Sequence, residues 1–360
     1  MSMILDGSNG VTFNDSSLQG AAASPFGLKN RIINGDMRID QRNAGASITP
    51  TDNQYSLDRW QCRLSQSSKY SVQQTTTAPS GFVSSLKVTS LSAYTVGSSE
   101  SFNIVQNIEG FNIGDLGWGT ANAKTITLSF QVYSSLTGTF GGSLENAATS
   151  RSYPFSYTIS SANTWTTISI TIAGDTTGAW SIDNGTGIRV WFSLGTGSTQ
   201  SGTAGSWAST DYRSATGATS VVGTNGATWY VTGVQLEVGS TATPFERRMY
   251  GQELALCQRY FIRMTGRNIG YVRHDGAYNS FFTVPTLMRT DQPSGTFTTA
   301  GSFTNFQSAT ASSPSSFSVQ SESKAATRGF LYISCTLGSY TSHSFIPSWE
   351  GFQFDLSSEL

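Results

Sequence analysis

The sequence is short of charge. Only 12% of its 360 residues are Asp, Glu, Lys or Arg, and the formal net charge is -1. A chain without a basic excess lacks the electrostatic footprint that counterion-driven binding to DNA or to an anionic membrane requires. We therefore expect neither nucleic acid nor a membrane surface among its partners.

Cysteine and histidine are also scarce. Cys62, Cys257 and Cys335 are far apart and form no C-x-x-C motif. The sequence thus indicates neither a disulfide framework nor a cysteine zinc site, and we expect three buried free thiols. His274 and His343 lie in no H-E-x-x-H motif and beside no G-x-S-x-G elbow, which argues against zinc peptidases and hydrolytic triads. No catalytic residue and no cofactor is expected.

Long apolar runs are missing as well. No run approaches the length that crosses a bilayer, and the start, MSMILDGSNG, lacks the basic and apolar segments of a secretion signal. We expect synthesis in a bacterial cytoplasm without membrane insertion. Aromatic residues reach 12%, so the chain can bury a core and is expected to be globular rather than disordered.

Period-two alternation is abundant between about residues 30 and 248, where Gly, Asn and Ser turns separate short apolar runs. This pattern is typical of half-buried antiparallel strands. About eight strands are expected, a number that fits a jelly-roll β-sandwich of this size. The clear strands are ITLSFQVY, WTTISITI, IRVWFSL and WYVTGVQLEV, and the weaker ones are RIINGDMRI, DRWQCRL, SSLKVTS and SFNIVQNIE.

Alternation also predicts which side chains enter the core, because successive residues of a strand point to opposite faces. In the first three clear strands the core sets are Ile126, Leu128, Phe130 and Val132; Ile168, Ile170 and Ile172; and Ile188, Val190, Phe192 and Leu194. In the fourth, the predicted core set is Tyr230, Val234, Leu236 and Val238, which leaves Trp229, Gln235 and Glu237 outside. Glu237 is then expected on a solvent or partner face.

The charged segment TPFERR follows that fourth strand. Pro244 bars ladder pairing, so Glu246, Arg247 and Arg248 are expected to anchor the exit through ion pairs or to meet a neighbouring subunit. The alternative is a capping box from Thr243 to Glu246, with Pro244 at the first helical position.

Helical spacing is confined to YGQELALCQRYF, where Tyr250, Leu254, Cys257 and Phe261 form one apolar stripe. The sequence therefore predicts an all-β protein with one short linking helix. Its parts are a linker or attachment arm (1–29), a jelly-roll β-sandwich (30–248), a connecting helix (249–262) and a smaller C-terminal β-sandwich domain (263–360). The arm holds one strand-like piece, GVTFNDSSLQG.

Five blocks of the sequence resemble, in order and spacing, a module of bacteriophage tail fibres and related virion proteins. The resemblance covers roughly residues 30–262, and beyond it only VPTLMR and FQFDLSSEL look like the family. The blocks are NRIINGDMRIDQR, YSLDRW, IVQNIEG, LGWGTANAKTITLSFQVYSSLTGTFGGSLENAATSRSYPFSYTI and VTGVQLEVGSTATPFERRMYGQELALCQRYF.

The resemblance implies a jelly-roll similar to carbohydrate-binding modules, assembled into a homotrimeric fibre. It also implies an N-terminal arm that joins other phage tail proteins and a distal domain that contacts the host. On this basis we expect a virion protein that binds a host surface glycan or receptor without turnover. Two alternatives stay open, namely a glycan depolymerase and a purely architectural spacer.

Sugar recognition needs aromatic faces beside hydrogen-bonding groups, because a pyranose ring stacks its CH groups while its hydroxyls demand partners. Three aromatic–polar pairs lie two or more residues apart on predicted outer faces, and they line one groove if their strands share a sheet. A subunit interface is the other role open to them. In the distal domain, three further aromatics lie near turns. The candidates are Tyr133 with Gln131, Trp191 with Arg189, Trp229 with Gln235, and the distal Tyr278, Tyr340 and Trp349.

Two carboxylates are candidate calcium ligands. Asp36 and Asp183 lie in polar, turn-like contexts, where carboxylate and carbonyl oxygens suit that ion. The alternative is that these residues, like Asp40 and Asp58, serve turns and ion pairs and are not the acid pair of a glycan hydrolase.

Overall fold

The computed structural model describes residues 29–269 continuously and a set of shorter segments on either side. Side chains are described for residues 29–265, 288–289, 353 and 355–360. The shorter segments are 4–6, 10–12, 18–19, 271–272, 277–283, 288–289, 294–299, 302–304, 311–312, 314–319, 330–337 and 348–360.

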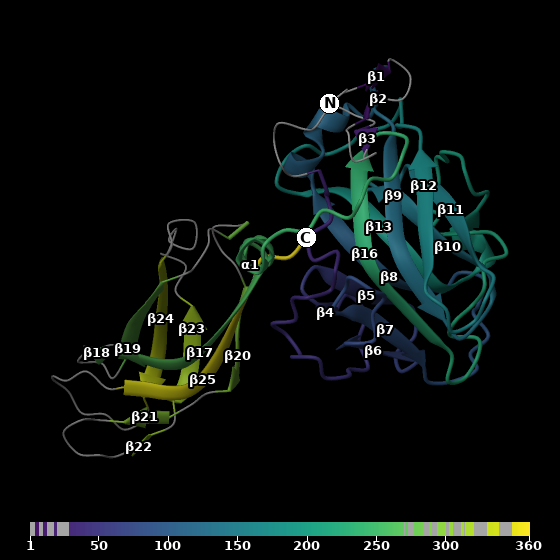
Figure 1. The fold of residues 1–360 in the computed structure, drawn as a ribbon. Coiled ribbons are helices and arrows are strands. Elements are labelled where there is room, and N and C mark those ends of the chain that lie inside the picture. The colour runs from purple at the N-terminus through teal and green to yellow at the C-terminus, as the bar shows by residue number, and fades with distance from the viewer. Residues whose placement is uncertain are drawn as a thin grey trace.

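The main body is a two-layer antiparallel β-sandwich (Figure 1). One layer has six strands in the order β11-β10-β13-β8-β5-β4, and the other has five in the order β12-β9-β16-β7-β6. The six are β4 (Tyr55–Leu57), β5 (Trp60–Leu64), β8 (Ser101–Glu109), β10 (Gly138–Asn146), β11 (Ser152–Ile159) and β13 (Thr186–Thr196). The five are β6 (Tyr70–Thr75), β7 (Ser85–Ser90), β9 (Ile126–Ser134), β12 (Thr166–Ile172) and β16 (Thr228–Val238).

The chain passes repeatedly from one layer to the other. After β5 it crosses to β6 and β7, returns for β8, crosses for β9, and continues in this way to β16. Such crossing is what a jelly-roll sandwich requires, so the predicted fold class is confirmed. Short elements in the connections are η1 (Gly110–Asn112), η2 (Gly114–Leu116), η3 (Ser198–Gln200), and the parallel pair β14 (Ser201–Gly202) and β15 (Ser214–Ala215).

The core lies between the two sheets and follows the predicted alternation in three of the four clear strands. All four predicted residues of β9 and all four of β13 are buried, while on β12 Ile172 is buried and Ile168 and Ile170 pack partly buried against them. Phe192 lies 5.1 Å from Phe130, centroid to centroid, so the two sheets interlock through aromatic rings. Burying each such side chain contributes about 1.5–3 kcal/mol.

Strand β16 departs from its predicted faces because it contains a β-bulge. Thr232 pairs with Gln131, but the next paired residue is Gln235, opposite Ser129, so β16 holds one extra residue. Gly233 occupies the bulge with φ +61°, a left-handed conformation that glycine adopts without a steric penalty. An extra residue reverses which side chains face the core.

Before the bulge, odd-numbered residues point inward, and after it even-numbered residues do. Trp229 is therefore buried in the core, and its predicted outer position is wrong. Tyr230 is buried but lies on the outer face beside Tyr133, so its predicted core position is wrong. Val238 keeps the predicted parity but is the last residue of β16 and is 42% exposed, so it is not part of the core. Val234 and Leu236 are buried as predicted.

Residues 31–39, RIINGDMRI, were predicted as a strand and form turns instead. Asn34 and Met37 have φ near +58° and +59°, which a strand cannot contain. The segment crosses β16 beyond the bulge, where the Val234 amide donates to Gly35 O at 2.9 Å and the Arg31 amide donates to Leu236 O at 2.9 Å. It thus satisfies backbone groups of β16 beyond Val231, where the pairing of β16 with β7 has ended.

Four strands of the sandwich were not predicted from the sequence, namely β4, β6, β10 and β11. Strand β10 contains Gly141 and Gly142, which blur the alternation. Close packing requires the second of them, because a Cβ there would lie 2.2 Å from Trp191 O. Strand β11 contains Pro154, which is tolerated because β11 is an edge strand.

Helix α1 (Tyr250–Gln258) connects the sandwich to the C-terminal strands. Residues 243–246 are not helical, so the predicted capping box is wrong. Cys257 is buried with Leu254 beside it, but Tyr250 is 58% exposed and Phe261 opens the next strand, so half of the predicted apolar stripe is wrong. Among the described residues, no helix is long and apolar enough to cross a membrane.

The C-terminal strands form a smaller pair of sheets, as predicted. One contains β17 (Phe261–Ile269), β20 (Ser294–Thr299), β21 (Ser302–Thr304), β22 (Ala311–Ser312) and β25 (Ser348–Ser357). The other contains β18 (Tyr271–Val272), β19 (Ala277–Thr283), β23 (Pro314–Val319) and β24 (Phe330–Leu337). In the N-terminal arm, β1 (Ile4–Asp6), β2 (Gly10–Thr12) and β3 (Leu18–Gln19) pair, so GVTFNDSSLQG supplies two short strands.

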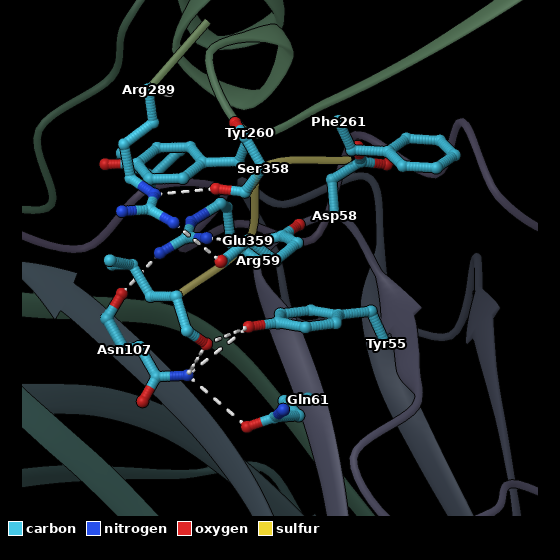
Figure 2. Close-up of polar contacts among 12 residues, drawn as sticks. Tyr55, Asp58, Arg59, Gln61, Asn107, Tyr260, Phe261, Arg289, Ser358 and Glu359 are labelled. Atoms are coloured by element: carbon cyan, nitrogen blue, oxygen red, sulfur yellow. Dashed lines mark hydrogen bonds and ion pairs between the residues drawn. The ribbon is translucent and has the colours of Figure 1, made fainter. Parts of the chain in front are cut away.

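A buried polar junction ties residues 358–360 to the sandwich (Figure 2). The Arg59 guanidinium is 1% exposed, pairs with the Glu359 carboxylate and lies 3.5 Å from the centre of the Tyr260 ring. Arg42 binds the other oxygen of Glu359 at 2.5 Å. Arg59 also donates to Asn107 O at 2.5 Å, so one side chain joins strand β8 to the end of β25.

Neighbouring groups complete this junction. The Tyr55 hydroxyl donates to Leu360 O at 3.0 Å, and burial raises the pKa of Tyr55 to about 12. Arg289 donates to Ser358 O at 2.6 Å and to Glu359 O at 2.9 Å. The backbone of residues 358–360 is therefore held by side chains from both parts of the protein.

We predict that Arg59→Met lowers the free energy of unfolding by about 3 kcal/mol, because it leaves the buried Glu359 carboxylate short of one partner. The control is Arg31→Met, which removes an exposed ion pair with Asp115 and should cost at most about 1 kcal/mol. Urea denaturation measures both. Equal small losses would show that the junction does not stabilise the fold.

Candidate functional site

A groove of about 510 Å³ lies on the outer face of the five-stranded sheet. Its floor comes from β12, β9 and the bulge of β16. Its wall comes from Phe82 and from residues 242–247, which we call the return segment because they fold back over β16. The lining residues are Phe82, Ser129, Phe130, Gln131, Thr167, Ile168, Ser169, Gly233, Ala242, Thr243, Pro244, Phe245 and Arg247.

The floor offers hydroxyl and amide groups. Thr167 of β12 lies opposite Gln131 of β9, and Ser169 lies opposite Ser129. The Gln131 amide donates to the Thr167 hydroxyl at 2.9 Å, which orients both side chains. All four residues are at least partly exposed and alternate with core residues, so donors and acceptors face the groove.

The wall offers aromatic rings and a cation. Phe82 packs edge to face on Phe245, with centroids 5.3 Å apart, and the Arg247 guanidinium lies 4.7 Å from the centre of the Phe82 ring. Gly233 makes this arrangement possible, because a Cβ at that position would lie 2.6 Å from the Phe82 ring. The bulge therefore makes room for the Phe82 side chain of the wall and also reverses which side chains of β16 face the core.

The outward side chains of β16 hold the return segment in place. Glu237 accepts hydrogen bonds from the Thr243 amide at 2.9 Å and the Thr243 hydroxyl at 2.6 Å. Gln235 accepts from the Glu246 amide at 2.7 Å and donates to Thr243 O at 3.1 Å. Glu237 is only 3% exposed, so its predicted place on an open solvent or partner face is wrong. It lies under the return segment, where its carboxylate accepts three hydrogen bonds.

Ion pairs complete this anchoring, as one of the two predictions for TPFERR stated. The Glu246 carboxylate accepts from the Lys29 and Asn30 amides at 3.1 and 3.0 Å. Arg248 pairs with Glu246 at 3.2 Å and with Glu253 of α1 at 3.4 Å. The exit from β16 is thus fixed to the start of the sandwich and to the helix.

An aromatic row crosses the same face beside the groove. Tyr133 and Tyr230 pair across β9 and β16 with ring centroids 4.9 Å apart, and Trp165 lies 5.5 Å from Tyr133. Lys87 lies opposite Tyr230 on β7, with its ammonium 5.8 Å from the Tyr230 ring. Tyr133 is two residues from Gln131, so ring faces and the polar floor share one surface.

Trp191 and Arg189 lie on the outer face of the other sheet, so the predicted single groove is wrong. Trp191 is 1% exposed between the guanidinium groups of Arg63 and Arg213, at 5.6 and 5.0 Å from its ring. Its indole donates to Glu145 at 3.2 Å, and Arg189 binds the same carboxyl oxygen at 3.2 Å. Trp191 is a buried support on that sheet and not an open ring.

Glu145 is the unusual titratable group at this second location. Burial raises the pKa of its carboxyl to about 8, and the adjacent Asp211 carboxylate adds to the effect. Burial opposes the ionisation of Asp211, but hydrogen bonds from Arg213 and Glu145 lower its pKa. Glu145 Oε1 has no protein donor, so a proton held there can donate to Asp211.

The remaining predicted residues fall into three groups. Trp229 lies in the core, where its indole donates to the Tyr157 hydroxyl at 3.1 Å, and Gln235 is fully used in holding the return segment. Tyr278 lies in β19 and Trp349 in β25, where the structure describes the backbone alone. Tyr340, His274, His343 and the Cys335 side chain lie outside the described residues.

The calcium candidates have protein partners. Asp36 forms an ion pair with Arg38, and Asp183 accepts from the Ser181 hydroxyl at 2.5 Å and the Gly185 amide at 2.8 Å. In the part of the chain that the structure describes, no three His, Cys, Asp or Glu side chains come together as a metal site would need. Neither candidate gains support as a metal ligand.

Sequence reasoning missed most of the groove. Phe82 lies in the loop before β7, and Phe245 and Arg247 were read only as parts of an exit from β16. Trp165 opens the predicted strand WTTISITI, and alternation with Ile168, Ile170 and Ile172 places it on the outer face, but it was not among the predicted site residues. The floor of the groove could have been predicted from the sequence. Alternation identified the core faces of β9 and β12 correctly, so it also identified the polar residues on their outer faces.

Comparisons with solved structures give distant similarity. They include the enzymatically active domain of tailspike protein 4 of bacteriophage CBA120 (11% identity, TM-score 0.32), with 58% of this chain matching 21% of that one. The protein TmCBM61 in complex with β-1,4-galactotriose matches at 10% identity and TM-score 0.31, over 59% of this chain and all of that one. The family 11 carbohydrate-binding module from Clostridium thermocellum, in complex with a mixed-linked tetrasaccharide, matches at 13% and 0.29, over 54% and 97%. These values are too low to transfer a function, and no family model or curated protein matches the chain.

We predict that Glu237→Ala frees the return segment, because three donors to this carboxylate lose a buried partner. Trypsin should then cleave after the exposed Arg247 several times faster, and the free energy of unfolding should fall by about 1–3 kcal/mol. The control is Glu100→Ala, whose carboxylate also accepts three hydrogen bonds or more but is partly exposed, so that water replaces it. Unchanged cleavage in Glu237→Ala would refute this role.

We predict that Glu145→Gln flattens the pH dependence of stability between about pH 5 and 8. The folded state holds a proton on Glu145 that the unfolded chain releases at its ordinary pKa, so stability is present at low pH and is lost as pH rises through about 8. Thermal unfolding midpoints across this range measure the slope. The control is Glu100→Gln, which should leave this slope unchanged, because hydrogen bonds from Gly97 and Tyr94 lower the pKa of Glu100 and its contribution is lost only at pH values below this range. Identical slopes in wild type and Glu145→Gln would contradict the assignment.

Proposed function

We propose that this protein binds a host surface glycan, without turning it over, on the outer face of its five-stranded sheet, as a subunit of a phage tail fibre. The observation that carries the proposal is the groove itself. It combines a hydroxyl and amide floor with aromatic walls, and its volume of about 510 Å³ lies in the range of ligand sites.

The chemistry of the face suits a sugar chain. A pyranose ring can place its CH face on an aromatic ring while its hydroxyls bond to Gln131, Thr167 and the two serines of the floor. Trp165 and Tyr133, which are partly exposed and packed beside the buried Tyr230, extend this surface beyond the groove, so more than one sugar residue can make contact.

The groove also supports binding without turnover. Glycoside hydrolysis uses two carboxyl groups about 5 Å or more apart, with the sugar between them. Among the described residues that line the groove, none is Asp or Glu. The Glu145–Asp211 pair lies away from the groove, and Glu145 is fully buried, with Trp191 and Arg189 both donating to one of its carboxyl oxygens.

The fibre part of the proposal is supported by the five resembling sequence blocks. A homotrimer would present three copies of the groove, and linked sites raise the effective concentration of later contacts by orders of magnitude. Weak binding at each groove would then suffice for attachment of a virion. The N-terminal arm would join other tail proteins, and the C-terminal strands would offer a second contact with the host.

The test is binding of the purified protein to a glycan array and to susceptible bacteria. Trp165→Ala and Gln131→Ala should each weaken glycan binding about tenfold, because they remove a ring face or a floor donor. The control is Thr158→Ala, which removes an exposed hydroxyl from the six-stranded sheet. Each variant is checked for an unchanged unfolding midpoint.

Four outcomes would count against the proposal. Release of new reducing ends from the bound polysaccharide would show a depolymerase. Full binding by both groove variants would move the contact to residues 263–360, and failure to bind any cell or glycan would favour an architectural spacer. Native mass spectrometry should give three chains of 38.5 kDa, and a single chain would contradict the fibre assembly.

A further inference from the structure

The outer face of the five-stranded sheet carries unbalanced positive charge. Its five strands contain one base, Lys87, and one acid, Glu237. Glu237 is buried under Thr243, whose amide and hydroxyl occupy its oxygens. The charges that remain open on this face are therefore the Lys87 ammonium, beside the aromatic row, and the Arg247 guanidinium, at the groove.

Arg247 differs from every other arginine whose side chain the structure describes. The others form an ion pair with Asp or Glu, or, like Arg289, donate to backbone carbonyl oxygens. The Arg247 guanidinium contacts only ring faces, at 4.7 Å from Phe82 and 5.8 Å from Phe245. It is exposed and lines the groove, and among the residues that the structure describes no acceptor binds its N–H groups.

The rest of the chain shows how unusual this is. On the outer face of the six-stranded sheet, Arg63 and Arg213 are each matched by an Asp carboxylate, at 3.3 and 2.8 Å, and Arg189 donates to the Glu145 carboxyl group at 3.2 Å. In a protein with so few charges, an arginine without a partner that is held against an aromatic ring in a groove indicates an anionic ligand.

The geometry favours a carboxylate as that anion. A guanidinium presents a planar fork of N–H groups that matches a carboxylate in two parallel hydrogen bonds. Stacking on Phe82 restrains the Arg247 side chain before binding, so less rotational freedom is lost when a ligand pairs with it. The floor beside it is neutral, which suits one charged group on a ring that otherwise carries hydroxyls.

We propose that the groove selects an acidic sugar, a pyranose ring bearing a carboxylate, and that Arg247 is the residue that determines this specificity. The inference rests on the proposed glycan-binding function. The carboxylate meets the guanidinium edge, the sugar ring lies along Phe82 and Phe245, and its hydroxyls meet the floor of β9 and β12.

The experiment uses the full chain and a library of uronic acid-containing and sialylated oligosaccharides. Each is paired with its carboxyl-reduced neutral counterpart, so that only the charge differs. Wild type should bind acidic members about tenfold or more tightly than the reduced ones, and the difference should shrink in high salt. Arg247→Gln should abolish the preference, and Arg247→Lys, which keeps the charge without the fork, should restore part of it.

The matched control is Lys69→Gln, which removes another cation that rests on a ring, 4.3 Å from Tyr94, outside the groove lining. It changes the net charge by the same amount and should leave the preference intact. Equal binding of acidic and reduced partners, or an unchanged preference in Arg247→Gln, overturns the inference while the proposed function stands. A preference for phosphorylated or sulfated glycans over carboxylated ones overturns it too. Binding of no glycan at all refutes the proposed function itself.

Discussion

One extra residue in β16 determines the shape of the surface on which the rest depends. The bulge at Gly233 reverses the alternation of side chains, so that Trp229 enters the core from one half of the strand while Gln235 and Glu237 point outward from the other. Without the reversal, a glutamate would face the apolar interior, where an unpaired charge is strongly unfavourable. With it, the same glutamate fastens the return segment over the sheet, and the missing Cβ of Gly233 leaves space for Phe82.

The chain has few charged side chains, and several of its arginines form ion pairs that join separate segments. Arg59, Arg248 and Arg259 each join separate segments of chain by pairing with Glu359, Glu253 and Glu109. Such buried pairs contribute little net stability over apolar packing, but each is costly to break, so they specify one arrangement of the segments. Arg247 differs from these arginines because its guanidinium has no carboxylate partner among the described residues. This contrast is the reason for assigning it a role in ligand binding.

The sequence predicted the sandwich because strands such as β9 and β13 run regularly through a core between two sheets, where alternation must hold. It failed at β16, since a period-two pattern cannot reveal an inserted residue when both faces carry large side chains. It also failed at residues 31–39, where Asn34 and Met37 adopt left-handed conformations that β propensity does not reveal. The walls of the groove could not be predicted from the sequence for a different reason. They come from the loop before β7 and from residues 242–247, which are far apart along the chain.

The two outer faces of the sandwich differ in how far their polar and aromatic groups are already occupied by contacts within the protein. On the six-stranded sheet, Trp191 is enclosed by two arginines and donates to the buried Glu145 carboxyl group, so its ring and its indole N–H are already in use. On the five-stranded sheet, the groups of the groove are partly exposed and oriented by single contacts such as that between Gln131 and Thr167. A ligand gains free energy only from groups that the folded chain has left available. The five-stranded sheet is therefore the face on which the folded chain leaves hydroxyls, rings and one guanidinium available, and this is the basis of the proposed glycan site.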